Sequence, residues 1–302
     1  MQNSVMVVGE ALVDVVNGTP HVGGSPLNVA VGLARLGHDV SFVGRLGHDE
    51  YGSLISDHLR ANTVRCLLPP DRHPSSAAIA TLDATGSASY EFELVWELPP
   101  LPEWLPAALE GARAVHTGSI ATLLPPGADT VLEAIQSTRT HGALISFDPN
   151  CRPSITPDTA AARAKVEAFV ALSDVVKASD EDMVWLYPER PIEASAEAWR
   201  QLGPALVVVT RGSSGALAAH ANGLVTVPAP PVVVADTVGA GDSFMAALLA
   251  GFLDLGDDPR AMLTPASIEA LLRQATAAAA ITVGRVGANP PTREELASAA
   301  PA

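Results

Sequence analysis

The sequence is poor in cysteine, in metal-binding patterns and in long apolar runs. Its 302 residues include only two cysteines, Cys66 and Cys151, so a disulfide framework and a cysteine-ligated metal site are excluded. The eight histidines have no metal-ligand spacing, and no apolar run approaches the ~18 to 20 residues that span a bilayer. Because the first residues also lack the basic and apolar regions of a signal peptide, we expect a cytoplasmic protein.

Positive charge is scarce as well. Lysine and arginine total 18 against 33 aspartates and glutamates, which gives a formal net charge of −15, and no basic cluster occurs. This balance disfavours nucleic acids and anionic membranes as partners. An anionic small molecule would have to be bound by local backbone amides, a metal ion and a few arginines, because the overall charge repels it.

What the sequence does contain is an alternation of short apolar strands and helices. With 48 % hydrophobic residues the chain is not disordered, and 302 residues can bury one large α/β core. The pattern predicts strands at Val5–Val8, Val40–Val43, Ala114–His116, Ala143–Phe147, Val175–Lys177 and Leu206–Thr210, and helices at Pro26–Leu36, Tyr51–Ala61, Ala240–Leu253 and Ile268–Val283. Short buried strands between helices are typical of a mainly parallel sheet flanked by helices on both faces.

Two segments depart from this alternation. Residues 12–22 continue as a strand and a turn, with Asn17-Gly18 as a hairpin signal. Residues 76–98 are predicted to form a long hairpin whose turn lies at 83–86. We interpret both segments as a small β lid that is inserted in a single domain of residues 1–302.

The most informative stretch is the glycine-rich segment DTVGAGDSF, residues 236–244, which leads directly into an apolar helix. Small residues there let the backbone amides of Gly239, Ala240 and Gly241 converge on an anion, and the helix dipole adds positive potential. Asp242 would repel a phosphate, so its place beside this anion hole indicates a catalytic base for an incoming hydroxyl group. Taken alone, the segment is equally consistent with a tight turn in which Asp242 is a helix N-cap.

A second motif lies far upstream, GGSPLNVAVGLARLG at residues 23–37. Together the two motifs resemble the two signatures of the ribokinase-like carbohydrate kinases, also called the PfkB family. Four further landmarks occur in the family order, namely Gly9–Asp14, Gly44–Gly47, Asp148–Arg152 and Thr210–Gly212. The resemblance covers nearly the whole chain, and several of its segments are most similar to the fructokinase branch.

This resemblance implies an ATP-dependent kinase that phosphorylates a sugar hydroxyl, with a ketohexose such as fructose as the substrate and Mg²⁺ as a cofactor. The implied sugar contacts are Asp14, Gly23, Gly24, Asn28 and Arg152. A carboxylate such as that of Asp14 can accept hydrogen bonds from two neighbouring hydroxyls, and glycine lets the backbone approach a ligand closely. Each of these residues also has a purely structural alternative. Asp14 could be a solvated acid at a strand end, Asn28 could hydrogen-bond the backbone at a helix start, and Arg152 could belong to a turn.

The resemblance also implies where the nucleotide and Mg²⁺ bind. Five residues would lie along the nucleotide phosphates and ribose: Lys177, Thr210, Arg211, Gly212 and Gly215. Asp182 stands where the family has the final acid of an Asn/Ser-x-x-Glu element tied to Mg²⁺ and phosphate, and it would act on the metal directly or through water. Ser179 and Asp182 also have the spacing of a helix capping box, and both roles can hold together.

A monovalent cation is the last ligand that the resemblance suggests. In many family members the segments that match Asp236, Val238 and Gly287 enclose K⁺ beside the anion site. The alternative is that Asp236 only caps its own loop through the backbone.

The sequence thus predicts a ribokinase-like sugar kinase that binds a sugar and ATP and is a monomer or a homodimer formed through the lid. Two other functions stay open. One is a kinase of the same fold that acts on a nucleoside or on 2-keto-3-deoxygluconate. The other is a non-catalytic sugar- or nucleotide-binding regulator, against which the intact Asp242 and its glycines argue.

Overall fold

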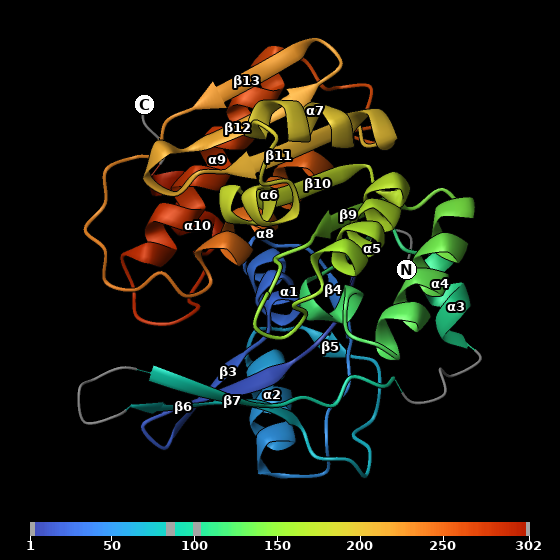
Figure 1. Cartoon of the computed structure of the whole chain (residues 1–302), viewed down its shortest axis with the longest axis vertical. Helices are drawn as coiled ribbons and strands as arrows, with labels where there is room; N and C mark the ends of the chain where they lie inside the picture. Colours follow the sequence, from blue (N-terminus) through green and yellow to red (C-terminus); the bar gives the residue numbers. More distant parts are fainter. Residues whose placement is uncertain (1–3, 83–87, 99–103, 300–302) are drawn as a thin grey trace.

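The chain is built around a large sheet (Figure 1), which the computed structural model describes together with the rest of residues 4–82, 88–98 and 104–299. Its strands are β1 (Val5–Val8), β4 (Val40–Val43), β5 (Arg65–Cys66), β8 (Ala114–Gly118), β9 (Leu144–Asp148), β10 (Val175–Ser179), β11 (Leu206–Thr210), β12 (Ala216–His220) and β13 (Gly223–Val227). In space they follow the order β13-β12-β11-β10-β9-β8-β1-β4-β5, and every pair from β11 to β5 is parallel.

Helices cover both faces of this sheet. One core includes residues of α1 (Ser25–Arg35), α2 (Glu50–Ala61), α8 (Ala240–Asp254), α9 (Pro265–Val283) and α10 (Arg293–Ala299). The other includes residues of α3 (Trp104–Glu110), α4 (Gly127–Thr140), α5 (Thr159–Leu172), α6 (Asp180–Leu186) and α7 (Ile192–Leu202). The strands are apolar at successive positions because both faces are buried: Val5 and Val7 belong to the first core, Met6 and Val8 to the second. The expected parallel sheet with helices on both faces is confirmed.

A second, four-stranded sheet projects from the main body (Figure 1). Its order is β3 (Thr19–Gly23), β2 (Leu12–Val16), β6 (Ser76–Leu82) and β7 (Ala88–Glu93), so both segments that depart from the strand–helix alternation belong to it. Asn17 and Gly18 form the β2–β3 turn with φ of 52° and 76°, as the hairpin signal predicted. The turn expected at 83–86 lies outside the described residues. We call β3-β2-β6-β7 the small sheet.

The antiparallel edge formed by β12 and β13 was not predicted from the sequence. The two strands pair from Ala216 with Val227 to His220 with Gly223. The signal was available, since Asn222-Gly223 stands between two apolar stretches and such a pair favours a tight hairpin.

Helix α8 is buried along almost its whole length, from Asp242 to Leu253, because it packs between α1 and α9 against the sheet. That position explains why its sequence is apolar on every side. In the described part of the chain, no helix is both long enough and apolar enough to cross a membrane.

Candidate active site

Two adjoining cavities lie where α8 begins and the parallel strands end. The larger has a volume of about 840 Å³ and the smaller about 660 Å³. Thr210, Gly212, Thr237 and Gly241 line both, so the two cavities form one continuous groove. The carboxyl ends of parallel strands are where open α/β sheets bind their ligands.

The loop that begins α8 has a backbone that requires glycine. Gly239 has a φ of 74°, and a Cβ added there would lie 2.6 Å from the Cβ of Ala288. Of the three amides expected to form the anion hole, that of Ala240 donates to the carbonyl of Thr237 at 3.3 Å. Within the described residues the amides of Gly241 and Asp242 have no acceptor, so Asp242 contributes an N–H group that the sequence did not single out.

The carboxylate of Asp242 is held by the start of α1. Ser25 Oγ donates to its Oδ1 at 2.7 Å, and Asn28 Nδ2 donates to its Oδ2 at 2.8 Å. Asp242 is 7 % exposed and lines the larger cavity. Asn28 therefore orients the expected base as well as lining the cavity, and Ser25 is a site residue that sequence reasoning missed. Ser25 and Asn28 both lie in the first turn of α1. The upstream motif and the glycine-rich loop therefore meet at this point.

The small sheet supplies one wall of the larger cavity. Leu12 and Asp14 of β2, Ala78 of β6 and Phe92 of β7 line it. Burial raises the pKa of the Asp14 carboxyl, while His21 and Arg152 lower it. Asp14 lines the larger cavity, and its role as an acceptor for sugar hydroxyls stays a prediction.

The two glycines after β3 serve different purposes. A Cβ on Gly23 would lie 2.5 Å from Asp14 Oδ2, so this glycine makes room for that carboxylate and does not itself line the cavity. Gly24 has a φ of 108° and would bring a Cβ within 2.8 Å of the Glu10 carbonyl. Gly24 does line the cavity.

Glu10 is a second residue that sequence reasoning did not assign to the site. It lies two residues beyond the end of β1, is 3 % exposed, and lines the larger cavity. Its Oε2 accepts a hydrogen bond from the Ala121 amide at 3.1 Å. Burial raises its pKa to about 8, against the opposing effects of hydrogen bonds and of Arg152. Glu10 is therefore protonated near neutral pH and can donate a hydrogen bond into the cavity.

The raised pKa of Glu10 predicts a pH-dependent effect of Glu10→Gln. Because the folded state holds the proton up to about pH 8, wild-type stability falls as the pH rises from about 4.5 to about 8. Glutamine resembles the protonated acid, so the variant should match the wild type near pH 5. Above about pH 8 it should be more stable by at most about 5 kcal/mol, at about 1.4 kcal/mol per pKa unit. Urea unfolding at several pH values checks this, and a stability difference that does not grow with pH contradicts it.

Arg152 reaches the larger cavity from the loop after β9. Its Nη1 donates to Asn150 Oδ1 at 2.6 Å and to the carbonyls of Asn150 and Cys151, while the side chain is exposed. Asn150 has a φ of 36°. The turn and the cavity-lining position expected as alternatives are thus both present.

Lys177 and Asp148 form a buried ion pair under the start of α8. Lys177 Nζ donates to Asp148 Oδ2 at 2.8 Å, and the two side chains are 4 % and 0 % exposed. Burial raises the pKa of Asp148 to about 6, which Lys177 opposes. The sequence grouped Lys177 with the nucleotide contacts, and in the structure it lines the larger cavity beside Asp242.

Asp182 forms the capping box of α6 that its spacing allowed. Its Oδ2 accepts from the amide and the hydroxyl of Ser179, both at 2.8 Å, and its Oδ1 accepts from the Cys151 amide at 2.8 Å. These three donors occupy the carboxylate, which does not suit direct ligation of Mg²⁺. Over the described parts of the chain, no group of three or more His, Cys, Asp or Glu could hold a metal ion.

The three residues expected around a monovalent cation lie together. Asp236 Oδ1 accepts from the Val238 amide at 3.0 Å, and Oδ2 accepts from the Gly287 amide at 2.8 Å. These hydrogen bonds lower the pKa of Asp236. Asp236 therefore caps its loop, as the alternative stated, and also ties that loop to the segment around Gly287.

The smaller cavity is lined by three of the five residues expected along the nucleotide. Thr210, Gly212 and Gly215 line it, opposite an apolar wall that includes Val232, Val234, Ala279, Ala280 and Val283. Arg211 is not among its lining residues, and its amide donates to the Gly215 carbonyl at 2.8 Å. Arg211 thus shapes the turn between β11 and β12.

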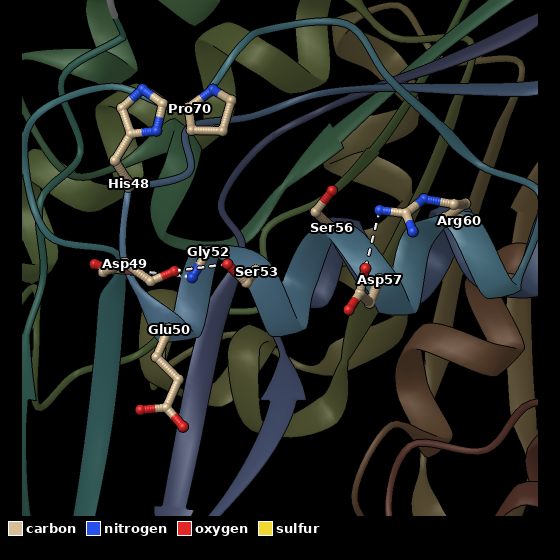
Figure 2. Close-up of a pocket in the computed structure, with 10 residues that line it drawn as sticks. His48, Asp49, Glu50, Gly52, Ser53, Ser56, Asp57, Arg60 and Pro70 are labelled. Atoms are coloured by element: carbon tan, nitrogen blue, oxygen red, sulfur yellow. Dashed lines mark hydrogen bonds and ion pairs between the residues drawn. The ribbon is translucent and has the colours of Figure 1, made fainter.

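A third hollow, of about 460 Å³, lies at the start of α2 (Figure 2). Asp49 caps this helix by accepting from the Gly52 amide at 2.7 Å, and Asp57 pairs with Arg60 at 2.9 Å (Figure 2). None of the expected site residues lines it. Most of the expected site residues line the other two cavities instead.

The sequence and the fold are similar to those of known carbohydrate kinases. Residues 3–295 match the family described as pfkB family carbohydrate kinase. A fructokinase of Salmonella typhimurium is 34 % identical over 260 residues, which are 83 % of this chain and 84 % of that protein. The structure of a fructokinase from Xylella fastidiosa with bound ATP has a TM-score of 0.85 at 29 % identity and covers 99 % of this chain and 98 % of its own. A fructokinase double mutant from Vibrio cholerae with fructose, ADP and a potassium ion has a TM-score of 0.82 at 28 % identity and covers 98 % of both chains.

Proposed function

The chain belongs to the pfkB family of carbohydrate kinases, and we propose that it transfers the γ-phosphoryl group of ATP to a ketohexose, with fructose as the preferred acceptor. It is an ATP-dependent sugar kinase with a ribokinase-like fold. The observation that supports fructose is that relatives called fructokinases match most of the chain at about a third identity. The fructose- and ADP-bound neighbour has the same fold over nearly its whole length.

In this proposal the sugar occupies the larger cavity and ATP the smaller one. Asp14 accepts hydrogen bonds from sugar hydroxyls, protonated Glu10 donates one, and Arg152 faces the phosphoryl or the sugar. The small sheet acts as a lid over the sugar, because four of its side chains already line that cavity. Excluding water there protects the phosphoryl group from hydrolysis.

Asp242 is the proposed base. A carboxylate is too weak to deprotonate an alcohol in advance, so the proton moves late, as bond formation makes the hydroxyl more acidic. Ser25 and Asn28 hold both carboxylate oxygens and fix the direction of the lone pair that takes the proton. The amides of Gly239, Gly241 and Asp242, none of which has an acceptor among the described residues, stabilise charge on the transferring group.

When bound with ATP, Mg²⁺ would supply positive charge that offsets the charge of the phosphates. Because three protein donors occupy Asp182, we propose that Asp182 and the neighbouring Asp180 act on the ion through bound water. The remaining predictions from the sequence, a cytoplasmic location and a monomer or a dimer through the lid, stay predictions.

Substrate preference tests the proposed function directly. Steady-state kinetics with fructose, ribose, adenosine and 2-keto-3-deoxygluconate should give fructose the highest kcat/KM, measured by ADP release. A kcat/KM far higher for any of the others would contradict the choice of fructose while leaving the kinase activity intact. A protein that releases no ADP with any acceptor would contradict the function itself.

We also propose that K⁺ binds beside the loop tied down by Asp236. Such a cation would fix residues 238–241 and raise kcat by preorganising the amides, without touching the sugar. Activity in K⁺ should therefore exceed activity in a bulky organic cation at matched ionic strength. Equal kcat in the two salts would leave Asp236 with its capping role alone.

A further inference from the structure

Lysine is nearly absent from this chain. It has two lysines, Lys165 and Lys177, against sixteen arginines. Lys165 lies on the surface and pairs with Asp129, but Lys177 is 3 % exposed at the centre of the site. An ammonium group is a compact point charge, whereas a guanidinium is a broad planar fork. The one buried lysine therefore places a compact positive charge in this site.

The ammonium group of Lys177 lies next to the first turn of α8. A Cβ added to Gly241 would lie 3.1 Å from Lys177 Nζ. Gly241 and Asp242, the expected anion-hole residue and base, line the same cavity as Lys177. Within the described residues, the ammonium makes a single hydrogen bond, to Asp148 Oδ2 at 2.8 Å. An ammonium has three donors, so two of them have no protein acceptor.

Acidic neighbours keep this lysine charged. Burial alone would lower the pKa of Lys177, but Asp148, Asp182 and Asp242 raise it above its ordinary value. Asp148 Oδ1, the second oxygen of the partner carboxylate, has no hydrogen bond with any residue that the structure describes. The hydrogen-bonding capacity of the Lys177–Asp148 pair is thus only partly used. A buried ion pair of this kind is weak evidence that the pair stabilises the fold.

We propose that Lys177 is a catalytic residue that donates hydrogen bonds directly to the transferring phosphoryl group, and that Asp148 is the residue that positions it. During transfer the bond from the γ-phosphorus to the ADP oxygen breaks, the bond from the sugar oxygen to phosphorus forms, and the hydroxyl proton goes to Asp242. Lys177 keeps its protons throughout and supplies positive charge opposite the amides of α8. This inference rests on the proposed kinase activity and goes beyond a contact with bound nucleotide.

The decisive variants are Lys177→Met and the double variant Lys177→Met/Asp148→Asn. The single variant leaves Asp148 buried without its partner, which costs stability. The double variant removes both charges at similar volume, so it should fold, as thermal unfolding will show. Its kcat should be about 10²–10³-fold below that of the wild type, as for the loss of one preorganised donor. Calorimetric affinities for sugar and for ADP should stay close to those of the wild type.

Lys165→Met is the matched control, because it removes the other lysine at a half-buried site outside both cavities, and it should retain wild-type kcat. Recovery of kcat in the double variant would overturn the inference, since Lys177 would then only neutralise Asp148. A double variant that fails to fold would also count against it, because the pair would be structural. An affinity of the double variant for ADP that falls by the same factor as kcat would also overturn the inference.

The assay uses whichever acceptor the wild type turns over fastest, so the choice of fructose does not affect the result. A wild type that is inactive with every acceptor contradicts the proposed function and the inference together. An active wild type with an active double variant contradicts the inference alone.

Discussion

Asp242→Asn is expected to lower kcat by about 10²–10⁴-fold, the usual loss when a general base is removed. The carboxylate lines the larger cavity, and both of its oxygens are held by donors from α1. An asparagine in this position cannot take the hydroxyl proton. Nucleotide affinity should change little, because Asp242 does not line the smaller cavity, where ATP is proposed to bind. Steady-state kinetics and calorimetric titration with ADP measure the two effects.

Asp254→Asn is the matched control for this variant. Asp254 ends the same helix and pairs at the surface with Arg293, far along α8 from the groove. Its replacement should leave kcat unchanged, which excludes a general effect of removing an acid from α8. Near-native turnover by Asp242→Asn on the best acceptor would refute the assignment of Asp242 as the base.

The fold was largely predictable because its signals are local. Short runs such as Val5–Val8 and Val40–Val43 are apolar at every position, which happens when both faces of a parallel strand are buried. The turn at Asn17-Gly18 needs positive φ at both positions, and the sequence supplies two residues that tolerate it. The β12–β13 hairpin was missed although Asn222-Gly223 gives the same kind of signal.

The motifs of the candidate site could be predicted from the sequence, but the side-chain contacts between them could not. The glycine-rich loop can be recognised in the sequence, because Gly239 has no room for a side chain beside Ala288. The pairing of Ser25 with Asp242 spans more than two hundred residues, and no local pattern encodes it. Glu10 and the Lys177–Asp148 pair likewise depend on burial, which raises a pKa only after the chain has folded.

Asp182 shows a further limit of reading sites from sequence. The same spacing fits a metal-associated acid and a capping box, and the structure shows the capping box complete. A carboxylate has a limited number of lone pairs, so donors at Ser179 and Cys151 compete with a metal for them. Only the three-dimensional arrangement reveals that competition.

Asp14→Ala is expected to weaken sugar binding by about 1.5–3 kcal/mol, the typical worth of hydrogen bonds to a charged group. That is roughly 10- to 150-fold in Kd, at tenfold per 1.4 kcal/mol. The reason is that Asp14 lies on β2 of the small sheet and faces the larger cavity, where its proposed partners are sugar hydroxyls. The residues that line the smaller cavity do not include it, so affinity for ADP should hardly change.

Calorimetric titration with fructose and with ADP separates the two affinities. Thr19→Ala is the matched control, because Thr19 is exposed on β3 of the same sheet and does not line the larger cavity. It should leave both affinities unchanged and so exclude a general weakening of the small sheet. An Asp14→Ala variant that loses sugar and ADP affinity equally would indicate instead that the carboxylate holds β2 in place. In that case the space that Gly23 leaves for Asp14 Oδ2 would serve the packing of the small sheet and not the recognition of a sugar.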